Sequence, residues 1–169
     1  MSDPLSFVAG VAGLTSLAIE LLKILNAYAS DAKSAPTHVS QLLMEVKALS
    51  TVLRQLQSFL YDNDINQESF KETSALLSII TICKTKLENL YQKLKKKYPG
   101  KKGVLRLIDR LQWPFDKQQC EDAITALHRY TQIFNFSLNI SHWYVLLYIA
   151  VELKYTPRSI SGMIWTLNS

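Results

Sequence analysis

The chain has 169 residues, five glycines, five prolines, two cysteines and a formal net charge of +5. This length suffices for one domain that buries its own core without metals or disulfides. The low glycine and proline content favours helices and argues against an all-β fold. The chain starts Met-Ser-Asp without a basic region, so we expect no secretory signal and a cytoplasmic location. Thiols stay reduced in that compartment, and we expect Cys83 and Cys120 to be reduced, structural thiols.

The first predicted helix runs from Leu5 to about Ser30, and its first half falls in a run of 16 consecutive uncharged residues, 4–19. Its apolar residues recur every three or four positions, which predicts one face turned to a core; they are Leu14, Leu17, Leu21, Ile24 and Tyr28. Gly10 and Gly13 each cost a helix about 1 kcal/mol relative to Ala, which indicates close approach of another backbone. Two interpretations stay open, a tightly packed core helix and a membrane-active segment, because 16 residues fall just below the roughly 17–25 that span a bilayer.

The next two predicted helices each carry a continuous apolar stripe. One begins at Pro36 and runs to about Leu60, with Val39, Leu42, Val46, Leu49, Leu53, Leu56 and Leu60 in three-four spacing. The other begins at residues 67–69 and ends at Lys97 before Pro99-Gly100, with Leu76, Ile80, Cys83, Leu87, Leu90 and Leu94 on its stripe. Such stripes are typical of helical bundles and coiled coils.

A short helix is predicted over residues 104–111, and Pro114 then ends helical geometry at Trp113. Asp116 is a suitable N-cap, with Gln119 three positions later, for a last long helix that we expect to reach about Asn139. Its stripe is Cys120, Ile124, Leu127, Thr131, Phe134 and Leu138.

Beyond Asn139 the amphipathic pattern fails. Residues 143–151 are apolar on all sides but too short to span a bilayer, so residues 141–169 form a tail that either docks as a fifth helix or is a poorly ordered end. The expected fold is therefore all-α: an antiparallel bundle of four long helices, with a short extra helix before the last, over residues 1–140, followed by this tail.

The positive charge is local. Residues 93–110 contain eight Lys or Arg against Asp109 alone, a net charge of +7. Part of this charge complements the dipole at the end of a helix, and a solvated helix end is the simple explanation. The window also suits anionic membrane lipids, while the few aromatic residues nearby argue against nucleic acid as the partner. Its candidate lipid contacts are Lys95, Lys96, Lys97, Lys101, Lys102 and Arg106.

No catalytic signature is present: the chain lacks a phosphate-binding loop, a nucleophile elbow and an HExxH motif. His38, His128 and His142 are far apart and are not spaced with carboxylates as metal ligands would be. We therefore expect no enzyme activity, no metal and no cofactor.

Two motifs carry a family resemblance: the opening Asp3-Pro4-Leu5-Ser6 before an Ala/Gly-rich helix, and Leu111-Gln112-Trp113-Pro114-Phe115 before the last helix. Together with the leucine stripe of the second helix, they resemble the fungal HeLo and HeLo-like N-terminal domains. Such domains precede NACHT or other nucleotide-binding modules and ankyrin repeats in NOD-like (STAND) receptors. The chain departs from that pattern because no such module follows within it and residues 141–169 do not match.

The resemblance implies a signalling or effector domain of regulated cell death or heterokaryon incompatibility, recruited to the plasma membrane. In that family the first helix leaves the bundle and disrupts membranes. The residues implied for that role here are Leu5, Phe7, Val8, Val11, Leu14 and Leu17. The alternative is a non-catalytic adaptor bundle that binds other protein domains, or copies of itself, without membrane activity.

Overall fold

The computed structural model describes residues 4–31, 37–61, 73–97 and 113–155. Nearly all of these residues are helical, in α1 (Pro4–Asp31), α2 (Thr37–Tyr61), α4 (Thr73–Lys97) and α5 (Lys117–Tyr155). The predicted all-α fold with four long helices is confirmed. The short helix predicted over residues 104–111 and the predicted start of the third helix at residues 67–69 lie outside the described residues.

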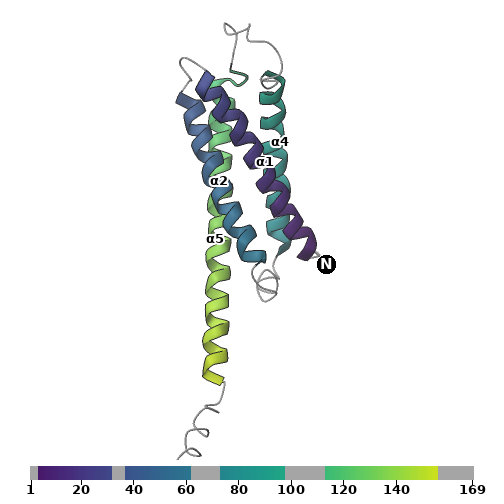
Figure 1. Ribbon diagram of the computed structural model, residues 1–169, viewed down its shortest axis with the longest axis vertical. Coiled ribbons are helices and arrows are strands. Elements are labelled where there is room, and N and C mark those ends of the chain that lie inside the picture. The colour runs from purple at the N-terminus through teal and green to yellow at the C-terminus, as the bar shows by residue number, and fades with distance from the viewer. Residues whose placement is uncertain (1–3, 32–36, 62–72, 98–112, 156–169) are drawn as a thin grey trace, which may run out of the picture.

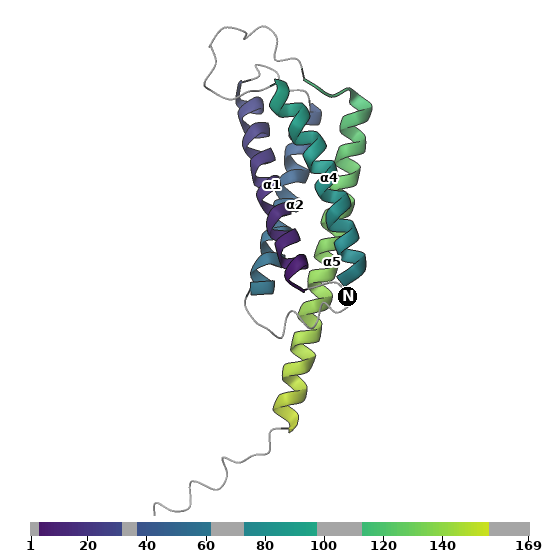
Figure 2. The same cartoon turned by 90° about the vertical axis from the view of Figure 1, so that its right-hand side faces the viewer.

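The four helices alternate in direction along the chain and form an antiparallel bundle (Figures 1 and 2). α1 packs between α2 and α4, and α2 packs against α5, whereas α4 and α5 touch more lightly. Consequently the pairs α1–α4 and α2–α5 are parallel neighbours. The end of α4 meets the start of α5, where Lys93 Nζ lies 5.4 Å from the centre of the Phe115 ring.

α1 buries a broad face because it packs between two helices. Its fully inward residues follow alternating steps of four and three: Phe7, Val11, Leu14, Ala18, Leu21, Leu25 and Tyr28. Leu17 and Ile24, which the sequence placed on the stripe, are only partly buried and lie at its margin. Ala18 and Leu25 take the central positions instead.

The stripes predicted for the other helices form the rest of a single core. Every apolar stripe residue of α2 from Val39 to Leu60 is buried. In α4 the stripe is buried from Ile80 onward, and Leu76 packs partly buried at its beginning. In α5 the residues Cys120, Leu127, Phe134 and Leu138 are buried, while Ile124 and Thr131 are half-buried at the edge.

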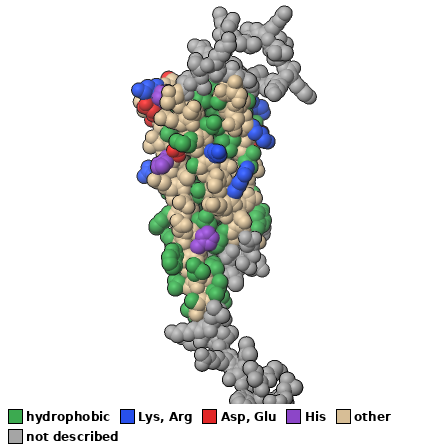
Figure 3. All heavy atoms as spheres, turned by 60° about the vertical axis from the view of Figure 1, so that its left-hand side comes forward, with side chains coloured by type: hydrophobic (Ala, Val, Ile, Leu, Met, Phe, Trp, Pro, Cys, Tyr) green, Lys and Arg blue, Asp and Glu red, His purple; other side chains and the backbone are tan. Residues whose placement is uncertain are grey.

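The last helix does not end near Asn139, so that prediction is wrong. α5 continues to Tyr155, and its final turns project beyond the other three helices (Figure 1). No glycine or proline occurs between Phe115 and Thr156, and nothing in this stretch interrupts the helical hydrogen bonds. Figure 3 shows hydrophobic side chains gathered on the visible face of the projecting part. Residues 156–169 lie outside the described residues.

Candidate functional site

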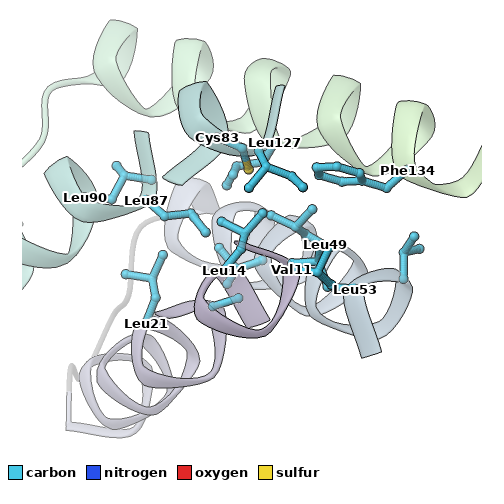
Figure 4. Packing of buried hydrophobic residues seen from close by; sticks show 14 of the residues in the cluster. Val11, Leu14, Leu21, Leu49, Leu53, Cys83, Leu87, Leu90, Leu127 and Phe134 are labelled. Atoms are coloured by element: carbon cyan, nitrogen blue, oxygen red, sulfur yellow. The ribbon is translucent and has the colours of Figure 1, made fainter. Parts of the chain in front are cut away.

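The residues implied as membrane-active point into the bundle core. Phe7, Val11 and Leu14 are buried, and Val8 and Leu17 are partly buried against the same core. Val11 and Leu14 meet Leu49, Leu53 and neighbouring residues of α2 in the centre (Figure 4). The side chain of Leu5 lies outside the described part. In this structure the large apolar groups of α1 therefore hold the bundle together.

By length and composition, α1 could nevertheless cross a membrane over Ser6–Ser30. A helix buried in a protein core can meet the same criterion, and the inward face of α1 is buried in the bundle core. The structure thus gives α1 both properties, a buried place in the bundle and a composition compatible with lipid.

In the first half of α1 the outward face is made of small residues: Ser6, Ala9, Gly13 and Ser16 are exposed. The two glycines predicted close approach of another backbone, but the close neighbour found at Gly10 is a side chain of α4. A Cβ added at Gly10 would lie 3.3 Å from Cγ2 of Ile80 in α4, whereas one added at Gly13 would meet nothing within 4 Å. Gly10 therefore lets α1 and α4 pack closely, and the prediction is wrong for Gly13 because that position faces open space.

Two of the six candidate lipid contacts can be placed. Lys95 and Lys96 are exposed in the last turn of α4, and Nζ of Lys95 lies 5.3 Å from the centre of the Tyr91 ring. The side chain of Lys97, together with Lys101, Lys102 and Arg106, lies outside the described part of the chain. Nearby, Lys93 sits over Phe115 and donates a hydrogen bond to Oε1 of Gln119 at 3.5 Å, so its ammonium group already has partners.

An aromatic corner joins α1, α4 and α5 at the same end of the bundle. It consists of Tyr28, Trp113 and Phe115 together with Cys120. The Trp113 ring lies 5.0 Å from Tyr28 and 5.1 Å from Phe115, centre to centre, and its indole N–H donates a hydrogen bond to Sγ of Cys120 at 3.0 Å. The Trp-Pro-Phe motif was identified in the sequence, but its contacts with Tyr28 and Cys120 were not, because they depend on how the helices pack.

The predicted cap of α5 is confirmed. The backbone N–H of Gln119 donates to Oδ1 of Asp116 at 2.7 Å, as expected for an N-cap and its third helical residue. This bond fixes where α5 begins, directly after the aromatic corner.

Both cysteines are free and buried, as the sequence predicted. Burial raises the pKa of the Cys83 thiol to about 12. Burial also raises the pKa of Cys120, an effect that its hydrogen bond from Trp113 partly offsets and the nearby Asp116 and Glu121 charges reinforce. Because nucleophilic cysteines need a lowered pKa, these environments suit structural thiols.

The three histidines lie at separate places. His142 packs edge-on against Phe59, with ring centres 4.7 Å apart, and Nδ1 of His128 lies 3.3 Å from Oε2 of Glu45. Both contacts join α5 to α2. Among the residues that the structure describes, no group of three or more His, Cys, Asp or Glu is arranged to hold a metal ion.

Among the described residues, most of the exposed large hydrophobic side chains lie on α5 and none lies on α1. We call this surface of α5 the apolar extension; it consists of Phe136, Ile140, Trp143, Tyr144, Leu146, Leu147, Ile149 and Val151. The sequence identified residues 143–151 as apolar on all sides, but it did not show that they continue α5 away from the bundle.

The described parts of the two motifs behind the fungal-type resemblance, Pro4–Ser6 and Trp113–Phe115, lie at the start of α1 and in the aromatic corner. Comparison of the chain with curated proteins and with solved structures gave no match. One family model matches residues 2–140, described as pigment biosynthesis cluster protein PigL N-terminal. Since this match covers most of the chain, the chain belongs to the family of PigL-type N-terminal domains.

Proposed function

We propose that this domain is a non-enzymatic effector or signalling module of the fungal NOD-like receptor type, acting in cell death or incompatibility by targeting membranes with α1. The observation that carries the proposal is the dual character of α1, which is buried in the bundle yet long and apolar enough to cross a bilayer. We further propose that the domain is cytoplasmic and is recruited to the plasma membrane through the basic end of α4. It uses no cofactor, and its partners are other protein domains, copies of itself and anionic lipids.

Release of α1 requires the bundle to open. Burial of one large apolar side chain contributes roughly 1.5–3 kcal/mol, so the inward face of α1 contributes on the order of 10 kcal/mol. That is comparable to the whole stability of a typical domain, about 5–15 kcal/mol. Membrane insertion must therefore compensate by burying the same side chains in lipid, and we expect α1 to leave only when a membrane is present.

Dye release from vesicles tests the proposal. The full chain is expected to release dye from vesicles that contain anionic lipid and to release less from neutral vesicles, because cations near an anionic surface favour binding. Deleting α1 is not a usable control, since its side chains form the core. If neither kind of vesicle releases dye at any protein-to-lipid ratio, the membrane mechanism is wrong.

The second candidate function is an adaptor bundle without membrane activity. It is favoured by the complete burial of Phe7, Val11 and Leu14 and by the location of the exposed apolar surface on α5. An adaptor would bind protein partners and leave vesicles intact. The same dye-release experiment separates the two functions.

A further inference from the structure

The apolar extension of α5 leaves a large hydrophobic surface exposed. Trp143 is 67% exposed, Leu146 58% and Leu147 60%. With typical side-chain areas, its eight residues leave on the order of 1,000 Å² in water, beyond the few hundred Å² that monomers usually expose in one patch. A surface of this size indicates a binding partner.

The pattern of the extension favours a helical protein partner over a bilayer. Residues 143–151 extend about 14 Å, less than half of the roughly 30 Å hydrocarbon core. Glu152 and Lys154 follow directly, so insertion by the tip would carry two charges into lipid, which is costly.

A second copy of the chain meets the requirements that the extension sets. Between Arg129 and Glu152 there is no Asp, Glu, Lys or Arg, so two extensions carry no like charges that would repel. The end of α4, which carries the exposed Lys95 and Lys96, lies at the opposite end of the bundle from the projecting part of α5 (Figure 1). An antiparallel arrangement also leaves room for both bundles at opposite ends of the pair.

The exposed area of two extensions is large enough for a weak but specific dimer. If about half of each exposed surface is covered, two copies together remove about 1,000 Å² from water, which is near the lower limit for specific interfaces. A symmetric two-copy contact is also the commonest form of homo-oligomer.

We propose that the apolar extension of α5 is a self-association surface that packs against the same segment of a second copy. This inference rests on the self-association named in the proposed function and not on its membrane step. Because the experiment uses lipid-free buffer, its failure is distinguishable from a failure of dye release.

Sedimentation velocity of the full chain, from about 1 to about 100 µM, tests the proposal. The expected result is a concentration-dependent monomer–dimer equilibrium. Leu146→Gln with Leu147→Gln is expected to raise the dimer Kd at least tenfold, as is Ile149→Gln with Val151→Gln. The matched control is Met44→Gln with Ile82→Gln, which changes residues of similar exposure, 62% and 56%, on α2 and α4 and should leave the Kd unchanged.

Three results would overturn the proposal: a monomer at every concentration, equal weakening by the control, or no weakening by either extension variant. In a further arm the same samples are sedimented with vesicles of mixed neutral and anionic lipid. A monomeric chain that binds vesicles only when Leu146 and Leu147 are intact would assign the extension to lipid instead. Since the replaced side chains are exposed, circular dichroism is expected to show the same helix content in every variant.

Discussion

The indole N–H of Trp113 donates a hydrogen bond to Sγ of Cys120 at 3.0 Å, which ties the segment before α5 to the first turn of that helix. The same indole ring packs on Tyr28 near the end of α1. One side chain thus links the end of α1 to the start of α5, and all three residues lie within the family-matched region, residues 2–140. The aromatic corner therefore holds α1 and α5 together at one end of the bundle.

Replacing Trp113 by Phe should destabilise the aromatic corner. The ring contacts are largely kept but the N–H donor is lost, so we expect the free energy of unfolding to fall by about 1 kcal/mol in urea titrations. The pKa of Cys120 should rise further, because the lost hydrogen bond favours the thiolate. A double-mutant cycle with Cys120→Ala measures the coupling, and a coupling of zero would show that the bond contributes nothing.

Gly10 and Gly13 should respond differently to alanine. Gly13→Ala is expected to raise the free energy of unfolding by about 0.5–1 kcal/mol, since Ala favours the helix and the added methyl meets nothing. Gly10→Ala should gain less, because its methyl would lie 3.3 Å from Ile80 Cγ2 and that side chain must shift. Equal gains in chemical denaturation would contradict close packing of α1 on α4.

The buried Cys83 thiol should make the bundle less stable in alkali. Its pKa is about 12 in the folded chain, against an ordinary value of 9.0. Below pH 9 the folded and the unfolded chain both keep the thiol proton, so the buried thiol contributes fully to the free energy of unfolding. Between these values only the unfolded chain releases the proton, and the free energy of unfolding should fall by about 1.4 kcal/mol per pH unit.

The raised pKa values of Tyr28, Cys120 and Tyr130 act in the same direction, so the test compares slopes. Unfolding of Cys83→Ala between pH 9 and 12 should show a shallower slope than wild type. An unchanged slope would mean that Cys83 titrates normally in the folded protein.

Neutralising the basic window should weaken binding to anionic vesicles selectively. Replacing Lys95, Lys96, Lys97, Lys101 and Lys102 by Gln removes cations that each contribute about 1 kcal/mol near an anionic surface. We expect at least a tenfold weaker partition to anionic vesicles and little change with neutral ones, measured by co-sedimentation. If the ratio of the two affinities is unchanged, the window is only a solvated helix end.

Apolar spacing predicted most of the fold because three-four periodicity alone decides which residues face a bundle core. The stripe of α2 and the Asp116 cap needed no tertiary information, and both are confirmed. The buried face of α1 differs from the predicted stripe because α1 packs against two helices, α2 and α4, and its buried face is therefore broader. Sequence periodicity does not reveal how many neighbours a helix has.

The end of α5 was missed for a related reason. Loss of amphipathicity after Asn139 marks where the helix leaves its neighbours, not where helical hydrogen bonding ends. The candidate membrane residues were assigned from the family resemblance, and the uncharged composition of their segment does not distinguish a core helix from a lipid-contacting one. Only the burial of Phe7, Val11 and Leu14 shows where they lie in the bundle.

The proposed function requires α1 to leave the bundle core before it acts on membranes, and a reversible clamp can test this requirement. Gly10→Cys with Ile80→Cys would join α1 to α4. A Cβ at position 10 would lie 3.3 Å from Cγ2 of Ile80, and Cγ2 is bonded directly to the Cβ of that residue. The two Cβ atoms are therefore close to the separation of about 3.5–4.5 Å that a disulfide requires. Cys83→Ala and Cys120→Ala remove competing thiols, and this background without the clamp is the control.

The decisive measurement is dye release from anionic vesicles by the clamped chain before and after reduction. We predict little release while the disulfide is intact and release at the level of the control once it is reduced. Equal release by the oxidised and reduced forms would contradict the account, because α1 would then not need to leave α4.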